Sequence, residues 1–521
     1  MVDAFGAQNA DVCQNAGLLP SAVLVSWDGK SLGSSRTIRS ILRVEREVSF
    51  VTLPKIIMDA AKAEVSYARE PRVEELVSRL ERIPTSRWHV RTRIIVGIAT
   101  FFDAFDILAI AFVLPALIRE WHLTTAQAGI LISAGFAGQF AGAFILGGLA
   151  ERIGRIPTIT ISVALFSIAS LFCAATSSVA VLVVLRAIQG IGLGGEVPVA
   201  ATYINELTKS HHRGRFILLY EVIFPVGLVF AGFVGSWVVP TFGWRYMFLI
   251  GGLPAVLAVY LTRLIPESPR WLIAQGELGR AAEVIGTIER AAGKTVGKSV
   301  PAERASAKVA GPTLVVPARS RFGELLSPFY RGRTIVIWLL WFCSAFVVYG
   351  LVSWLPTIYS SVYDVPIKDA LRFGLFTNIA GLAGTIACAL LIDVVGRRRW
   401  FTLAFACGAV VLAILTTQLA DVHKVVLLAS VGYFFVNTTA LALYVYTPEC
   451  YPTRFRAFGT SIGTAWQRVA AVVGPMLVSA LMTRHQIAHV FALYGLIAAL
   501  GALVSFWTIE TSNKQLEQIS P

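Results

Sequence analysis

A positive charge inside a long apolar stretch is the most unusual chemical feature of this chain. Arg468 lies near the middle of the apolar residues 457–483, in the sequence Thr-Ala-Trp-Gln-Arg. A guanidinium group does not discharge by losing a proton, so away from water it needs an anionic partner. No acidic residue lies mid-span in the apolar stretches after residue 334. We expect the carboxylate of a bound small molecule to be that partner, held by two parallel hydrogen bonds. The alternative is pairing with an aspartate from the first half of the chain.

Two carboxylates in the apolar residues 93–118 could carry a proton. Asp103 and Asp106 are three positions apart, which places them on one face of a helix. Two nearby carboxylates resist ionising together, so one of them is expected to keep its proton near neutral pH. The alternative is that one aspartate only satisfies the backbone of a neighbouring helix.

Three more ionisable residues belong to this group of proton-coupling candidates. Arg186 could neutralise one of the aspartates, and an ion pair that breaks on protonation would link protonation to a conformational change. Glu196 and Glu221 each fit either a proton site or a charge partner at an inner gate, and both interpretations stay open.

Aromatic and amide side chains near Arg468 in the sequence or in the apolar stretches could complete a binding site for a ring. Tryptophan and tyrosine side chains can also be anchors at the membrane–water interface, which is their commoner role near helix ends. The predicted substrate-binding residues are Arg468, Gln467, Trp466, Tyr349, Trp354, Asn378 and Asn437.

The elements that hold these residues are predicted from the composition and the apolar stretches. Of the 521 residues, 56% are hydrophobic and 15% are charged, whereas a soluble protein has about 25% charged residues. A helix of about 20 mostly apolar residues crosses a bilayer. The sequence therefore predicts an all-α membrane protein with twelve transmembrane helices, at 93–118, 126–150, 157–175, 179–203, 214–239, 246–265, 334–358, 370–394, 400–419, 424–446, 457–483 and 487–508.

Several other function classes are excluded by the same patterns. A net charge of +14 would suggest nucleic acid in a soluble protein, but here most basic residues lie in loops between apolar stretches, as in membrane proteins. The six cysteines form no CxxC pair, and His211 and His212 have no further ligands nearby. We predict no enzyme activity, no metal, no cofactor and no nucleic-acid partner.

The distribution of basic residues also predicts the topology. One set of short loops, which includes Arg152 and Arg397, holds more Lys and Arg than the opposite set, so it is expected in the cytoplasm together with both termini. We expect a plasma membrane, such as a bacterial inner membrane. The predicted parts are a cytosolic region 1–92 without usable pattern up to 57 and with an amphipathic helix near 70–83, a six-helix half 93–265, a cytosolic loop with a helix 266–333, a second half 334–508 and a tail 509–521.

Charged loop segments repeat at a nearly constant offset. Glu151 and Asp393, each followed three residues later by Gly-Arg, are 242 residues apart, and Glu206 and Glu449, each seven residues before an arginine, are 243 apart. Two loops that keep register within one residue predict two duplicated, pseudo-symmetric six-helix halves. Their charges could pair at cytosolic helix ends and hold an inner gate closed, or only set the topology. These gate candidates are Glu151, Arg152, Arg155, Glu206, Arg213, Asp393, Arg397, Glu449 and Arg456.

The segment Gly147 to Arg155 resembles the G-x-x-x-D-R-x-G-R-R loop signature of the major facilitator superfamily. It departs from that signature with Glu151 in place of Asp and Ile156 in place of the last basic residue. Arg186, in R-x-x-Q-G-x-G, resembles a second superfamily signature, and the resemblance implies a role in proton coupling. The resemblance implies a fold of twelve helices in two halves around one central site.

Other motifs resemble particular branches of the superfamily. Pro266-Glu-Ser-Pro-Arg-Trp-Leu272 resembles sugar porters and organic-ion transporters. Tyr446-Thr-Pro-Glu449 with the following Tyr-Pro-Thr-Arg, and Phe102-Asp-Ala-Phe-Asp106, resemble the synaptic-vesicle-protein-like branch of metabolite–proton symporters, to which bacterial niacin transporters belong. A basic residue on the eleventh helix is similar to the arrangement in related organic-anion transporters.

The expected function is therefore proton-coupled uptake of a small aromatic or heterocyclic carboxylate, with nicotinate as the leading candidate. A sugar–proton symporter is an alternative, although the paired glutamines typical of sugar porters are absent from 338–355. An organic-ion or drug exporter and a non-transporting membrane receptor are further alternatives.

Overall fold

The computed structural model describes residues 72–84, 86–207, 222–293, 323–452, 456–482 and 486–511, without the side chains of residues 456 and 457. Residues Val73–Pro521 form one compact unit, and all the helices named here belong to it. The regular elements in these described ranges are α-helices, and twelve helical stretches are long and apolar enough to cross a membrane. The predicted fold class is confirmed.

Six of these membrane spans lie before residue 265. They are α4 (Arg87–Trp121), α5 (Thr125–Ile153), α6 (Arg155–Ala175), α7 (Val179–Leu207), α9 (Ile223–Phe242) and a sixth span made of α10 (Arg245–Gly251) and α11 (Ala255–Leu264). The sixth span differs from the continuous helix predicted at 246–265. It breaks before Pro254, because proline lacks an N–H donor and clashes with the preceding helical turn.

The other six spans come after the central loop. They are α15 (Arg331–Ser361), α16 (Ile367–Val395), α17 (Arg397–Leu415), α18 (Val422–Glu449), α19 (Arg456–Met482) and α20 (Ile487–Ser505). The boundaries agree with the predicted stretches to within several residues.

Short helices pack against the first half at the end that carries the charged loop motifs. The helix predicted in the central loop is two helices, α12 (Pro269–Ala274) and α13 (Leu278–Ala291), separated at Gly276, whose φ is +79°. Residues 73–82 are helical and bury Leu76 and Leu80. Arg79 is paired with Glu289 of α13 at 2.7 Å, so this amphipathic helix contacts the central loop.

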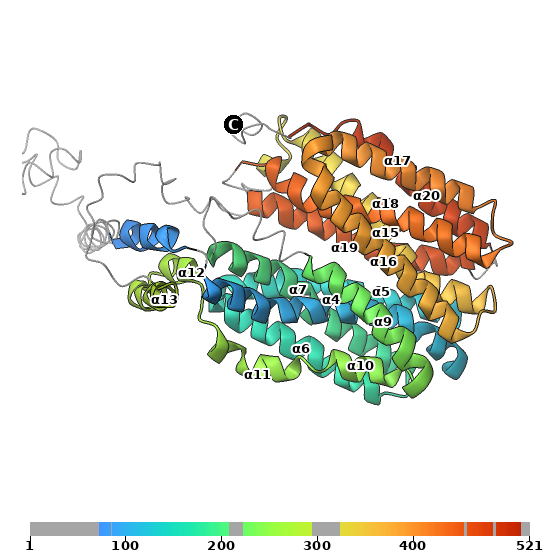
Figure 1. The fold of residues 1–521 in the computed structure, drawn as a ribbon, viewed down its shortest axis with the longest axis horizontal. Helices are drawn as coiled ribbons and strands as arrows, with labels where there is room; N and C mark the ends of the chain where they lie inside the picture. The colour runs from blue at the N-terminus through green and yellow to red at the C-terminus, as the bar shows by residue number, and fades with distance from the viewer. Residues whose placement is uncertain are drawn as a thin grey trace, which may run out of the picture. The chain divides into compact units, whose positions relative to one another are not determined.

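The spans form two groups, which are blue to green and yellow to red in Figure 1. In the first group α5 and α6 both pack on α7, and in the second α17 packs on α18 and α20. The groups meet through α5 with α19, α9 with α16, and α4 with α15. In the first contact, the second helix of the first half meets the fifth helix of the second half, and in the second contact the fifth meets the second. A two-fold pseudo-symmetry between the halves requires this reciprocal pattern.

Candidate functional site

A cavity of ≈110 Å³ lies between the two groups of helices. Its walls come from α4, α5, α7 and α9 on one side and from α15, α16, α18 and α19 on the other. Since one water occupies roughly 10–15 Å³ on this measure, the cavity holds the equivalent of about seven to eleven waters. This size is compatible with a small molecule such as one aromatic ring with a carboxylate.

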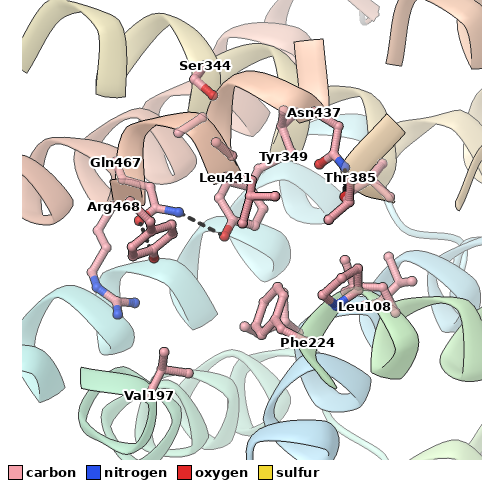
Figure 2. Close-up of a pocket in the computed structure, with 18 of the residues that line it drawn as sticks. Leu108, Val197, Phe224, Ser344, Tyr349, Thr385, Asn437, Leu441, Gln467 and Arg468 are labelled. Carbon is pink, nitrogen blue, oxygen red and sulfur yellow. Dashed lines mark hydrogen bonds between the residues drawn. The ribbon is translucent and has the colours of Figure 1, made fainter. Parts of the chain in front are cut away.

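Arg468 lines this cavity and reaches across it. Its Nη1 donates a hydrogen bond to Oε1 of Gln139 on α5 at 2.8 Å, and its Nη2 donates to the main-chain oxygen of Gly194 on α7 at 3.4 Å. Figure 2 shows the guanidinium pointing away from its own helix, toward helices of the first half. Both acceptors are neutral, and no ion pair in the described part of the chain involves Arg468. The predicted cation therefore faces a cavity and not lipid. It is hydrogen-bonded to neutral groups, and Asp103 is the described carboxylate that interacts with it electrostatically, without a direct ion pair.

The two aspartates of α4 have different surroundings. Asp103 is 1% exposed, lines the cavity and has no hydrogen-bond partner for Oδ1 among the described residues. Asp106 is fully buried inside the first half, where Ser170 of α6 donates to its Oδ1 at 3.4 Å. Asp103 lies at the cavity and Asp106 one helical turn further, toward α6, yet the two carboxylates remain close enough to interact electrostatically. Which of them carries a proton stays a prediction.

The remaining proton-coupling candidates lie within the first half. Arg186 is buried and donates from Nη1 to Gln189 Oε1 at 2.6 Å and to the main-chain oxygen of Asp106 at 3.4 Å. Glu196 is buried and accepts hydrogen bonds from Thr100 at 3.0 and 3.2 Å. Neither residue lines the cavity. Glu221 lies outside the described residues.

Four of the seven predicted substrate-binding residues line the cavity, namely Arg468, Gln467, Tyr349 and Asn437. Gln467 donates from Nε2 to the hydroxyl of Tyr349 at 3.2 Å, as Figure 2 shows, and the Tyr349 ring lies 5.0 Å from that of Phe136. These contacts hold the tyrosine ring at the cavity wall.

Three predicted residues do not line the cavity, and the interpretation of them as walls of this site is corrected. Trp466 is exposed and stacks on Trp338 at 5.6 Å between ring centroids, since it lies on another face of α19 from Arg468. Trp354 and Asn378 are buried in helix packing. Asn378 donates to the main-chain oxygen of Gly374 one turn earlier on α16.

The charged loop motifs form one cluster in each half. Arg155 pairs with Glu151 at 3.2 Å and with Glu206 at 3.0 Å. In the second half, Arg397 pairs with Asp393 at 2.7 Å and with Glu449 at 3.1 Å. Each cluster joins helices of its own half, so these pairs do not connect the halves in this conformation.

The other gate candidates add nothing to these clusters in the described structure. Arg152 is exposed and makes no ion pair with a described residue. Arg213 and the side chain of Arg456 lie outside the described part, so the expected pairs with Glu206 and Glu449 stay predictions.

A third carboxylate completes each cluster, and sequence reasoning missed both. Glu267 accepts hydrogen bonds from the main-chain N–H groups of Arg155 and Ile156 at 3.0 and 3.1 Å, at the start of α6. Glu510 accepts from those of Arg397 and Arg398 at 2.9 and 3.1 Å, at the start of α17. Glu267 and Glu510 are 243 residues apart, the same offset as Glu206 and Glu449, and this offset could have revealed them.

The preceding glycines explain how these carboxylates reach the helix ends. Gly154 has a φ of +107° and Gly396 a φ of +89°, and a Cβ at either position would collide with the capping glutamate. A side chain there would be strained in backbone conformation as well. The glycine of each Gly-Arg pair therefore leaves room for a carboxylate that caps the N-terminus of the helix that follows.

Known proteins agree with this geometry. A sequence model of the family "Sugar (and other) transporter" matches residues 58–521. The niacin transporter NiaP of Acinetobacter baylyi is 34% identical over 85% of this chain and 99% of its own length. The gallate transporter of Pseudomonas putida is 31% identical, over 77% of this chain and 88% of its own length. The inward-open structure of the xylose transporter XylE from E. coli superposes with a TM-score of 0.64 at 21% identity, and the match covers 82% of this chain and 98% of that one.

The chain belongs to the sugar (and other) transporter family of the major facilitator superfamily. The predicted resemblance is confirmed, and the protein is a multi-pass membrane transporter, not an enzyme. Gln139 is the residue of this transporter's site that sequence reasoning overlooked, although an amide between Gly138 and Gly142 in an apolar span was a visible signal.

Helices α5 and α19 are in close contact at one end of their interface. A Cβ on Gly129 would meet Ser479 at 2.6 Å, Ser133 donates to the main-chain oxygen of Val472 at 2.8 Å, and Gln139 meets Arg468. Further along the same face of α5, a Cβ on Gly147 would have no atom of a described residue within 4 Å. The two helices therefore diverge from the level of Arg468 toward the end that carries the charged loop motifs.

Proposed function

We propose that this transporter carries a small aromatic or heterocyclic monocarboxylate together with a proton, and that nicotinate is the first compound to test. The observation that carries the proposal is the Arg468 guanidinium, which faces the cavity without a direct ion pair to a described residue. A substrate carboxylate could replace the neutral acceptors Gln139 and Gly194 with two charge-assisted hydrogen bonds, which are roughly twice as strong as neutral ones.

Asp103 is the proposed proton carrier. It is buried at the wall of the same cavity, and its Oδ1 is unpartnered among the described residues. An ionised Asp103 would attract Arg468 and compete with the substrate, whereas a protonated Asp103 would leave the guanidinium free for it. Proton and carboxylate would therefore bind together, which is the requirement for symport.

The transport step is proposed to be alternating access. The halves are packed together at one end of α5 and α19 and apart at the other, as expected for a carrier open on one side. By the distribution of basic residues, the open end faces the cytoplasm, both termini lie there, and the membrane is a bacterial inner membrane. One proton with one monoanion is electroneutral, so each pH unit would contribute about 1.4 kcal/mol, or tenfold accumulation.

The similarity to proteins named as niacin and gallate transporters supports this substrate class, because both compounds are single-ring carboxylates in their ionised forms. A sugar substrate is the second candidate, suggested by the family's name and by the fold of the xylose transporter. The cavity offers hydroxyls and three amides, those of Gln139, Gln467 and Asn437, which a sugar could also use. The carboxylate is favoured by Arg468, because a neutral sugar supplies no anion for its guanidinium.

Uptake into proteoliposomes tests the proposal. With the purified protein and an alkaline lumen, labelled nicotinate or benzoate should accumulate above its external concentration, and a protonophore should abolish the accumulation. Arg468→Gln should reduce carboxylate affinity by about 10–150-fold, the loss expected for one charge-assisted interaction. Carboxylate uptake that ignores the pH gradient, or xylose uptake that survives Arg468→Gln, would favour the alternatives.

A further inference from the structure

The amide of Asn437 on α18 has its donors used and its acceptor free. Its Nδ2 donates to the main-chain oxygen of Gly381 at 3.0 Å and to Oγ1 of Thr385 at 3.2 Å, both on α16. A main-chain carbonyl can only accept, so this contact determines which end of the amide is nitrogen. No hydrogen bond to Asn437 Oδ1 occurs among the described residues, and the side chain lines the cavity. The cavity wall therefore presents an uncharged acceptor.

None of the described neighbours of Asn437 donates a hydrogen bond to its Oδ1. Thr385 uses its hydroxyl proton on the main-chain oxygen of Gly381 at 3.0 Å, so it accepts from Asn437 and cannot donate to it. Tyr433 lies one turn earlier on the same face of α18 and lines the cavity beside Asn437. Its ring packs against Gly381, where a Cβ would collide with it. The acceptor is thus held rigidly by α16 and is open only on the cavity side.

This acceptor lies away from the cation of the same site. Figure 2 shows Asn437 and Thr385 on one side of Tyr349 and Arg468 on the other. A ligand whose carboxylate meets Arg468 would present the far edge of its ring to Asn437. A second carboxylate at that edge would meet Oδ1 with like polarity, and a bare C–H edge would leave Oδ1 unsatisfied.

We propose that Asn437 Oδ1 selects substrates that carry a ring O–H or N–H donor on the edge opposite the carboxylate, such as hydroxylated aromatic monocarboxylates. The inference rests on the proposed function, and it refines that function to a substrate with two recognised groups. The ring nitrogen of nicotinate is a hydrogen-bond acceptor and has no proton to donate to Oδ1. Nicotinate is therefore expected to bind more weakly than a hydroxylated ring acid. A site built to accept a substrate hydroxyl rejects the analogue that lacks it, by about tenfold or more for one uncharged hydrogen bond.

Binding of matched ligands to the purified full chain in detergent tests this selectivity. The probes are benzoate, 3-hydroxybenzoate and 4-hydroxybenzoate, measured by calorimetry or by displacement of a labelled acid. At least one hydroxybenzoate should bind about tenfold or more tightly than benzoate. Equal affinity of all three acids would overturn the proposal.

Two substitutions at one position separate recognition from structure. Asn437→Leu removes the acceptor with little change in volume, whereas Asn437→Asp keeps an acceptor and loses the donors to α16. The readout is the ratio of hydroxybenzoate to benzoate affinity on the same sample, which does not depend on the folded fraction. The ratio should fall to about one in Asn437→Leu and persist in Asn437→Asp. A ratio unchanged in the leucine variant, or lost in both, would contradict the assignment of Oδ1.

Phenol, which has the hydroxyl without the carboxylate, distinguishes failure of this inference from failure of the proposed function. If no acid binds but phenol binds the wild type and not Asn437→Leu, the carboxylate proposal fails and the Asn437 assignment holds. If benzoate binds through Arg468, but phenol does not bind and added hydroxyl groups leave the affinity unchanged, the carboxylate proposal holds and the Asn437 assignment fails. If neither the acids nor phenol bind, both are rejected.

Discussion

The hydrogen bond from Arg468 Nη1 to Gln139 Oε1, at 2.8 Å, joins the eleventh membrane span to the second and so connects the two halves of the transporter. Its acceptor is neutral. A chain that supplied a charged acceptor at this position would satisfy the guanidinium by itself, and a substrate carboxylate would have to displace it.

Gln139→Glu makes that acceptor charged and should lower substrate affinity. A carboxylate at hydrogen-bond distance would form an internal ion pair with Arg468 and compete with the ligand, so we expect a loss of at least about tenfold in carboxylate affinity. Gln139→Met, of similar volume but without an acceptor, serves as the control and should change affinity less. Titration of benzoate by intrinsic fluorescence measures both, and equal affinities in the two variants would argue against Arg468 as the carboxylate ligand.

Asp103→Asn should separate exchange from accumulation. An asparagine cannot carry a proton through the cycle, so a pH gradient should no longer drive net uptake. Counterflow of labelled against unlabelled substrate should continue, because it needs no proton movement. Asp369→Asn, at an exposed carboxylate outside the cavity, is the control and should behave as wild type. Accumulation by the Asp103 variant that still follows the pH gradient would exclude this residue as the carrier.

Gly138→Ala should destabilise the contact between α5 and α7. The added Cβ would collide with the main-chain oxygen of Ala187, and a backbone atom cannot move as a flexible side chain does. Overpacking of this kind costs about 1–3 kcal/mol. Gly147→Ala, on the same helix, would place its Cβ in open space and should be neutral or slightly stabilising. Thermal unfolding of the two variants in one detergent checks the prediction, which a similar midpoint for both would contradict.

Glu267 predicts a pH dependence of stability at the end that carries the charged loop motifs. Burial raises the pKa of its carboxyl above the ordinary value of 4.5, although three main-chain N–H groups, those of Ser268, Ile156 and Arg155, act in the opposite direction. Because the folded state favours the protonated form, this group's contribution to stability is present below its ordinary pKa and is lost as pH rises through the raised pKa.

Glu267→Gln keeps an acceptor oxygen and removes the titration. The melting temperature of the wild type relative to this variant should therefore fall as pH increases from about 4 to about 7. Glu283→Gln, the same change on an exposed face of α13, is the control. A constant difference between wild type and Glu267→Gln over this range would mean that the buried carboxyl does not titrate there.

The position of the charges was predictable and the rotation of the helices was not. A guanidinium or carboxylate inside a span must face a cavity or a partner, because exposure to lipid is costly. This argument placed Arg468 and Asp103 at the cavity. Trp466 and Trp354 carry no such penalty, so the sequence did not determine which way their side chains point. Trp466 lies at the surface, and Trp354 is buried in the interior.

Contacts between distant segments could not be inferred from local pattern. Gly251, the last residue of α10, packs against Asp106, and a Cβ there would collide with Asp106 Oδ1, so the glycine makes room for this carboxylate inside the first half. The two residues lie nearly 150 positions apart, and neither position alone indicates the contact.

The matching caps of Glu267 and Glu510 also bear on the extent of the structural repeat. Each carboxylate lies outside its six-helix group, beyond Leu264 in one case and beyond Ser505 in the other. A repeated unit that stopped with its sixth span would contain neither carboxylate. The structural repeat therefore extends past that span, to a tail that folds back onto the start of the third helix of each half.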